Sequence, residues 1–281
     1  MTLNEIKAKY TDITHLKRGG QKTVYKATDS DNLCVALKII NNANDKRVLQ
    51  EIDLLRQLKF PNIPRIIDSG VVLDENINEN VLYIVEEYID GVSLRDWINA
   101  GNRFDLETAY SIIDSLLNIE VLLEENNILH RDINPNNIIL TDPKRMYLID
   151  FGLAKKLGNL SLTMTAAANG PFTPGYAPHE QFANMKLQQD SRTDLFQIGV
   201  TVYESCTGKN PFVDNGDSFY NILSKTATLM PPLLSLEGDT KGMLSQFVSM
   251  LMAKNQSQRP DTAKDALRYL LAIKDTLEWS D

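Results

Sequence analysis

HRDINPNN at residues 130–137, followed by DFG at residues 150–152, is the most informative part of this chain. Transfer of a γ-phosphoryl group depends on positioning and charge neutralisation, so its site needs a carboxylate facing the acceptor hydroxyl and oxygen ligands for Mg²⁺. Asp132, Asn137 and Asp150 are residue types that fit these roles. The stretch therefore indicates metal-dependent phosphoryl transfer.

The residues between the two motifs predict a β-hairpin. Residues 137–142 and 146–150 are short apolar runs, and Asp-Pro-Lys at 142–144 is a turn signal. Such a hairpin holds Asn137 and Asp150 close together. Read separately, HRD and DFG are three-letter words that occur by chance, most often as helix caps or turns. Their order on either side of a hairpin argues against a chance match.

Together the motifs resemble those of eukaryotic-type (Hanks-type) serine/threonine protein kinases, H-R-D-L-x-x-x-N followed by D-F-G. YAPHEQ at residues 176–181 resembles bacterial and phage-associated members. The resemblance covers residues 1–281 and implies an α+β, bilobal protein-kinase-like fold. It implies a small β-rich N-lobe with one long helix (about 1–87), a hinge (about 86–91) and a larger, mostly helical C-lobe (about 92–281).

An apolar run with a lysine set into it, LCVALKII at residues 33–40, predicts a buried strand that presents one cation. Its VALK segment matches the family's V-A-I-K strand, and the resemblance implies that Lys38 holds the α- and β-phosphates of ATP. A surface strand with a solvated lysine is the alternative, which the apolar neighbours on both sides disfavour.

Residues 46–58 carry apolar side chains at helical spacing and predict the long helix of the N-lobe. By resemblance, Glu51 of this helix pairs with Lys38. The alternative is that Glu51 is a solvated helix residue; Leu55 and Leu58 favour the kinase register.

The family's glycine-rich loop corresponds to KRGGQKTV at residues 17–24, which has glycine at only one of the three expected positions. Gly19 and Gly20 still allow a tight turn whose backbone N–H groups face a phosphate. Taken alone, the segment predicts an ordinary hairpin turn, and Lys38 downstream favours the nucleotide site. The resemblance places four further residues around the nucleotide: Val24, Ala36, Glu87 and Ile139.

Residues 80–91 predict a strand that runs into a polar connector, and they resemble the hinge against which adenine stacks. Glu86 stands at the position that controls the depth of the nucleotide pocket. Because an isolated buried carboxylate is costly, we expect Glu86 to be paired or solvated.

Residues 150–180 resemble the family's activation segment. Its hydroxyl residues Ser161, Thr163 and Thr165 lie in a polar run without helical or strand period, which predicts a mobile loop. Arg131 directly precedes the expected base and can bind a phosphate placed on this loop. We therefore expect phosphorylation of Thr163 or Thr165 to raise activity.

Two long helices are predicted after the hinge, at residues 106–126 and 190–204. The second resembles the large buried helix of the kinase C-lobe. By that resemblance, Asp194 accepts hydrogen bonds from the catalytic-loop backbone, and Arg259 pairs with Glu180.

Composition limits the other classes of function. The kinase resemblance accounts for nearly all of the 281 residues, so we expect no separate regulatory domain. A net charge of −8 argues against nucleic acid or an anionic membrane as a primary partner, since both favour basic surfaces. No apolar stretch approaches the ~20 residues of a membrane helix and no secretory apolar core is present, so we expect a cytoplasmic protein. No feature indicates an oligomeric state.

The other candidate sites are weak. Cys34 and Cys206 form neither a metal spacing nor a disulfide framework, and we expect buried free thiols. The histidines make no zinc pattern, and His130 is expected to pack against Phe151. The Gly-Lys pair at residues 208–209 lacks the rest of a P-loop, which disfavours a Walker-type ATPase.

The favoured function is transfer of the γ-phosphoryl group of Mg-ATP to a serine or threonine hydroxyl of a protein, including the chain itself. The implied cofactors are ATP and Mg²⁺, with Mn²⁺ as an alternative metal. The implied catalytic residues are the base Asp132, the metal ligands Asn137 and Asp150, and the phosphate ligand Lys38.

Asn134 stands where serine/threonine kinases normally have a lysine that touches the γ-phosphate. Loss of such a contact costs about 10²-fold in rate, unless another cation replaces it, and Lys22 is the first candidate. One alternative function is an ATP-binding pseudokinase scaffold, which Asn134 and the glycine-poor loop support and the retained base, metal ligands and lysine oppose. Another is a small-molecule kinase such as an antibiotic phosphotransferase, which the complete activation segment opposes.

Overall fold

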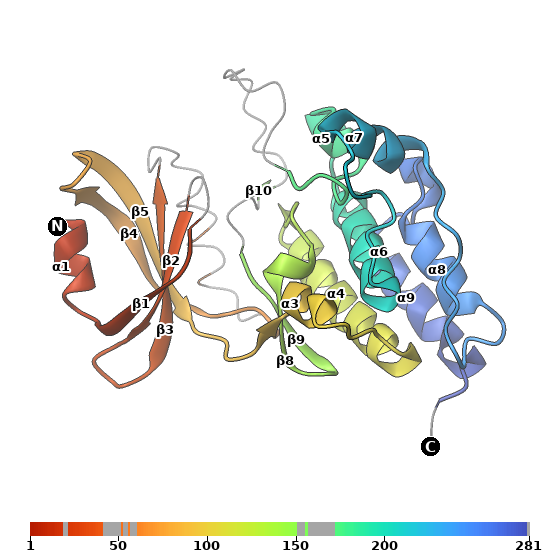
Figure 1. Cartoon of the computed structure of the whole chain (residues 1–281), viewed down its shortest axis with the longest axis horizontal. Coiled ribbons are helices and arrows are strands. Elements are labelled where there is room, and N and C mark those ends of the chain that lie inside the picture. The colour runs from red at the N-terminus through yellow and green to blue at the C-terminus, as the bar shows by residue number, and fades with distance from the viewer. Residues whose placement is uncertain are drawn as a thin grey trace. The chain divides into compact units, whose positions relative to one another are not determined.

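The computed structural model describes residues 1–18, 22–41, 52, 56, 61–150, 155–156 and 172–279. Two compact units make up the chain, Met1–Asp90 and Gly91–Asp281 (Figure 1). The first unit consists mainly of strands, and the second is larger and mostly helical. This confirms the predicted α+β fold with a β-rich N-terminal part and a helical C-terminal part.

One antiparallel sheet in the order β1-β2-β3-β5-β4 forms the first unit. Its elements are α1 (Leu3–Lys7), β1 (Thr11–Arg18), β2 (Lys22–Thr28), β3 (Cys34–Asn41), β4 (Ile66–Asp74) and β5 (Glu79–Glu87). The central strand β3 pairs without a break in register with both β2 and β5. The sheet therefore holds the side chains of β3 in a regular alternation.

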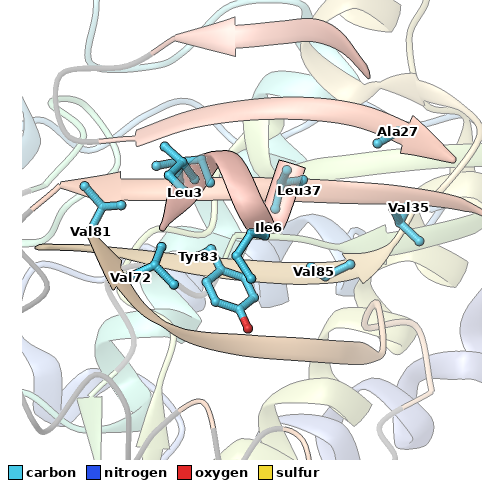
Figure 2. Close-up of a cluster of buried hydrophobic side chains, with 10 residues drawn as sticks. Leu3, Ile6, Ala27, Val35, Leu37, Val72, Val81, Tyr83 and Val85 are labelled. Carbon is cyan, nitrogen blue, oxygen red and sulfur yellow. The ribbon is translucent and has the colours of Figure 1, made fainter. Parts of the chain in front are cut away.

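Alternation along β3 separates a core face from a second face. Val35, Leu37 and Ile39 are buried in a cluster that also contains Leu3 and Ile6 of α1. Figure 2 shows the two α1 side chains lying over the strands beside Leu37. Because successive residues of a strand point to opposite faces, the residues between them, Ala36 and Lys38, lie on the second face.

The short helix α1 is held at its start by a capping box. The Thr2 hydroxyl accepts a hydrogen bond from the backbone of Glu5, and the Glu5 carboxylate accepts one from the backbone of Thr2. These bonds satisfy two backbone donors that a helix start otherwise leaves without partners. The cap thus fixes the helix that covers the core face.

The predicted hairpin after the catalytic loop is confirmed. In it, β8 (Ile138–Asp142) pairs with β9 (Arg145–Leu148), so that Ile138 lies opposite Leu148. The turn is closed by the Asp142 carboxylate, which accepts a hydrogen bond from the Lys144 backbone. A third strand, β6 (Val92–Ser93), pairs with the outer side of β8.

Helices build the rest of the second unit. They are α3 (Leu94–Asn99), α4 (Leu106–Glu125), α5 (His179–Phe182), α6 (Ser191–Thr207), α7 (Phe219–Thr228), α8 (Met243–Leu251) and α9 (Ala263–Ile273). Short 3-10 turns occur at η1 (Pro135–Asn137), η3 (Lys186–Gln188), η4 (Gln256–Gln258) and η5 (Lys274–Thr276), and β7 (Ile128–Leu129) pairs with β10 (Lys155–Lys156).

Helix α6 is the centre of the second unit. It lies beside α4, α8 and α9 (Figure 1). Most of its side chains are buried, on all sides of the helix. Asp190 caps its start by accepting from the Arg192 backbone, and Gly208 ends it at a φ of 79°. Only glycine adopts that left-handed conformation at no steric cost. Both long helices predicted after the hinge are confirmed.

Three expectations have other outcomes. The predicted N-lobe helix at 46–58 lies mostly outside the described residues, of which Ile52 and Arg56 are helical. The predicted burial of Cys34 is wrong, because it is the first residue of β3 and lies exposed at the strand end. Cys206 is half-buried, and burial raises the pKa of its thiol to about 12.

Within the described part of the chain, no helix has both the length and the apolar character to cross a bilayer.

Candidate active site

The carboxylate of Asp132 accepts hydrogen bonds from three side chains. Asn134 donates to Oδ1 at 3.0 Å, Asn137 donates to Oδ2 at 2.8 Å, and the Thr173 hydroxyl donates to Oδ1 at 2.6 Å. Burial raises the pKa of Asp132, while the bonds from Thr173 and Asn137 oppose the rise. The arrangement fixes both oxygens of the residue expected to act as the base.

Local sequence explains the shape of this loop. Asn134 caps the turn η1, since its side-chain oxygen accepts a hydrogen bond from the Asn136 backbone at 3.0 Å. Pro135 follows at the first position of the turn, where its missing N–H costs nothing. The same Asn134 amide thus caps the turn with its oxygen and holds Asp132 with its nitrogen.

The predicted metal ligands Asn137 and Asp150 are joined through the hairpin. The carbonyl of Asn137 accepts a 2.8 Å hydrogen bond from Ile149, the residue before Asp150. Asp150 has a φ of 81°, and its charge contributes to the raised pKa of Asp132. Phe151 and Gly152 lie outside the described residues.

The residue types present fit a divalent metal ion. The amide nitrogen of Asn137 donates to Asp132, which leaves its amide oxygen for the ligand role, and the carboxylate of Asp150 is the second predicted ligand. No group of three or more His, Cys, Asp or Glu suited to a metal occurs in the described part of the chain. One amide oxygen and one carboxylate suit a divalent cation that takes waters and substrate phosphates as its other ligands.

Helix α6 holds the catalytic loop by its backbone. The buried carboxylate of Asp194 accepts hydrogen bonds of 2.7 Å from the backbones of His130 and Arg131. This confirms the role that the resemblance implied for Asp194. Burial raises the pKa of this carboxyl to about 6. Arg131 has a φ of 65°, and the hydrogen bond that its backbone N–H donates to Asp194 stabilises that strained conformation.

Gln197, one turn further along α6, was not singled out from the sequence. Its side chain accepts from the Ile133 backbone at 2.7 Å and donates to the Arg131 carbonyl at 3.0 Å. Gln181 donates to that same carbonyl at 2.7 Å. The sequence does contain a signal for Gln197. It lies three residues after Asp194, so the two polar side chains share one face of the predicted helix.

The predicted pair of Glu180 and Arg259 is confirmed. Arg259 Nη1 lies 2.6 Å from Glu180 Oε1, and both side chains are buried. Arg259 also donates to the carbonyls of Ala253 and Arg192. The guanidinium thereby ties the end of the activation segment to α6 and to the segment before η4.

A cluster around Tyr176 was also missed. Arg95 of α3 lies 2.7 Å from Glu204 of α6 and 2.5 Å from the Tyr176 hydroxyl. The Tyr176 hydroxyl also donates to Glu204, and burial raises its pKa. The cluster holds the loop that contains Thr173, and its members are too far apart in sequence for any motif to join them.

In the first unit, Lys38 is buried and paired with Glu86. Lys38 Nζ lies 2.8 Å from Glu86 Oε1 and 2.6 Å from Oε2, and the residues are 5% and 9% exposed. The expectation that Glu86 is paired or solvated is confirmed, with Lys38 as the partner. The predicted partner Glu51 lies outside the described residues.

The structure places the other predicted nucleotide contacts as follows. Val24 lies opposite Lys38 across β2 and β3, and Ala36 lies opposite Glu86 across β3 and β5, so all four share the second face. Glu87 is exposed and accepts from the Arg65 backbone. Ile139 belongs to β8 of the second unit.

The remaining site expectations fall outside what the structure describes. These are the loop residues Gly19 and Gly20 and the phosphorylation candidates Ser161, Thr163 and Thr165. His130 is fully buried, and its ring contacts the Ile149 carbonyl at 3.3 Å. Its predicted packing against Phe151 lies outside the described residues as well.

Comparison with known proteins agrees with this geometry. A family model described as "Protein kinase domain" matches residues 10–270. A probable serine/threonine-protein kinase PknB of Bifidobacterium longum is 33% identical over 90% of this chain and 38% of that protein. Serine/threonine-protein kinase PrkC of Bacillus subtilis is 28% identical over 92% of this chain and 40% of that protein.

A human relative is also similar. Serine/threonine-protein kinase ULK1 is 29% identical over 83% of this chain and 22% of that protein. The chain thus spans less than half the length of these relatives. The matched range includes the catalytic loop, the hairpin and the paired Glu180 and Arg259. This chain belongs to the protein kinase domain family.

Proposed function

We propose that this chain is a protein serine/threonine kinase that transfers the γ-phosphoryl group of Mg-ATP to a hydroxyl of a protein, including its own. The observation that carries the proposal is the Asp132 carboxylate held by Asn134, Asn137 and Thr173. A fixed carboxylate next to a pair of metal-ligand types is what phosphoryl transfer needs. The names of the relatives, all serine/threonine-protein kinases, support the same activity.

Asp132 orients the acceptor hydroxyl and takes its proton at a carboxylate oxygen. Each carboxylate oxygen has two lone pairs: Oδ1 accepts from both Asn134 and Thr173, whereas Oδ2 accepts from Asn137 and keeps one lone pair for a substrate hydroxyl. Asn137 and Asp150 would hold Mg²⁺, which neutralises phosphate charge when bound. Mn²⁺ is the alternative metal for these oxygen ligands.

Nucleotide phosphates are assigned to Lys38, with Val24, Ala36, Glu87 and Ile139 around the nucleotide. Lys22, the proposed replacement for the missing lysine at Asn134, lies opposite Ile40, on the same face as Lys38. Two cations on one face favour binding of a polyphosphate.

The proposed N-lobe and C-lobe correspond to the two units, and residues 86–91 are the proposed hinge. The proposed substrate is a protein, since the chain retains the segment ending at Glu180, and a net charge of −8 favours a neutral or basic one. The charge also supports a protein that does not bind nucleic acid or anionic membranes. The proposed location is the cytoplasm.

The test measures transfer of labelled phosphate from Mg-ATP to the protein itself and to a basic test protein. Wild type is compared with Asp132→Asn, which keeps the size of the side chain and removes its basicity. We expect transfer by wild type and a loss of at least about 10²-fold in the variant. Equal signals from the two proteins would contradict the proposal.

The pseudokinase scaffold is the second candidate, because the Asn134 side chain is occupied with Asp132 and Asn136 and brings no positive charge. It predicts that Mg-ATP raises the melting temperature while no phosphate is transferred, since a ligand that binds only the native state stabilises it. The transfer assay and the thermal shift together separate the two functions.

A further inference from the structure

Lys38 and Glu86 are diagonal neighbours on adjacent strands. Lys38 lies opposite Ile84, and Glu86 is two residues further along β5, opposite Ala36. Diagonal pairs on one face are within reach of long side chains. The strand register alone therefore brings the ammonium group to the carboxylate.

This pair occupies the face of the sheet that is rich in lysine. Lys22 and Lys26 of β2 lie opposite Ile40 and Ala36 of β3. Both of these β3 residues are two positions from Lys38, so the three lysines share one face. Lys26 Nζ lies 4.3 Å from the centre of the Tyr88 ring. Glu86 brings a carboxylate to the same face and contacts Lys38 with both of its oxygens.

The stability of the fold does not by itself explain why a buried ion pair, Lys38 with Glu86, occupies these two positions. The Lys38 and Glu86 side chains are only 7% and 12% exposed, so both charges lose most of their hydration. Replacing a buried ion pair by apolar residues of similar volume is often neutral or stabilising. Ile84, directly opposite Lys38 on the same face, is buried and apolar, so this face accepts apolar side chains.

We propose that Glu86 is a positioning residue for Lys38: its carboxylate holds the ammonium group in place on the face that receives the phosphates of ATP. The proposal rests on the proposed nucleotide site. Glu86 belongs to the sheet itself, so it orients Lys38 through the register of β3 and β5. The ammonium group donates a 2.8 Å hydrogen bond to Oε1 and lies 2.6 Å from Oε2, so both carboxylate oxygens restrict where it can lie.

The test compares the dissociation constants of Mg-ATP and of adenosine, measured by calorimetry. Only Mg-ATP carries phosphates, so a residue that acts through Lys38 changes the preference for Mg-ATP over adenosine. A purely structural defect weakens both ligands equally. We expect Glu86→Gln to reduce the preference about tenfold, the scale of one charge-assisted hydrogen bond, with little change for adenosine.

Matched variants complete the design. Glu79→Gln removes the same charge from an exposed position on β5, and we expect it to keep the wild-type preference. Lys38→Met removes the phosphate ligand, so adding Glu86→Gln to it should change the preference by less than about twofold, because coupled residues are not additive. Glu86→Asp keeps the charge on a shorter side chain and should lose less than Glu86→Gln; it replaces Glu86→Gln if that variant does not fold.

The outcomes are distinct. An unchanged preference in Glu86→Gln and Glu86→Asp, or equal weakening of Mg-ATP and adenosine, would overturn the positioning role while leaving the kinase function intact. A wild-type protein that binds Mg-ATP no better than adenosine would overturn the nucleotide site itself, and with it both proposals.

Discussion

The Thr173 hydroxyl donates a 2.6 Å hydrogen bond to the Asp132 carboxylate, although 41 residues of sequence separate the two. Thr173 lies at the end of the activation segment, and Asp132 is the proposed base. Through this contact the loop that closes the segment also orients the carboxylate. Placement of that loop, which the Tyr176 cluster fixes, is therefore linked to the geometry of the base.

Thr173→Val is expected to reduce the rate of phosphate transfer by about 10-fold to 10²-fold, because a misplaced catalytic group costs that much. The hydrogen bond lowers the pKa of Asp132, so its loss raises that pKa further. A base with a higher pKa is ionised only at higher pH, and the acid limb of the pH–rate profile should therefore move to higher pH. Thr173→Ser keeps the hydroxyl and should keep the wild-type profile; a profile that is the same in all three proteins would contradict the assignment.

Lys22 is expected to supply the positive charge that Asn134 lacks. If it does, Lys22→Ala lowers the transfer rate by about tenfold or more in the wild-type background. The same change should cost much less in an Asn134→Lys background, where the family's usual cation is restored. A double-mutant cycle with the four proteins measures the difference. Equal losses in both backgrounds would show that Lys22 acts independently of the missing lysine.

Glu120 of α4 is expected to destabilise the fold. It is 0% exposed, and neither carboxylate oxygen has a hydrogen-bond partner among the described residues. A buried polar group without a partner costs about 1–3 kcal/mol. Glu120→Leu should therefore raise the melting temperature by a few degrees. The control Glu125→Gln, at an exposed position of the same helix, should leave it nearly unchanged.

The effect of Glu120 depends on pH in a defined direction. Burial and the neighbouring charges of Asp194 and Glu124 raise the pKa of Glu120 well above 4.5. The folded state then binds more protons than the unfolded state at pH above about 4.5, so stability falls as pH rises through this range. The stabilisation by Glu120→Leu should be larger at pH 8 than at pH 5. A gain that does not depend on pH would exclude the buried carboxyl as its cause.

Arg259→Leu should lower the free energy of unfolding by about 3–5 kcal/mol, because it leaves the Glu180 carboxylate buried without its partner. Arg268→Leu is the matched control: Arg268 pairs with Asp265 on the surface, with both side chains substantially exposed. Exposed pairs contribute about 0–1 kcal/mol. Chemical denaturation measures both changes, and similar losses in the two variants would contradict the distinction.

Local patterns in the sequence were sufficient for a large part of this protein. The hairpin of β8 and β9, the long helices α4 and α6 and the buried strand β3 all follow from apolar periodicity and turn signals, which act over a few residues. The partners Asp194, Glu180 and Arg259 came from the resemblance to kinases. These contacts depend on the order of elements that the family shares, so the motifs were sufficient to predict them.

Contacts that depend on strand register and helix packing were decided only by the tertiary structure. Glu86 was expected to need a partner, but only the register of β3 and β5 showed that the partner is Lys38, 48 residues away. Likewise, no local pattern places Thr173 on Asp132 or Glu120 beside Asp194. Side-chain identity states which charges must be satisfied, whereas long-range packing of the backbone selects the groups that satisfy them.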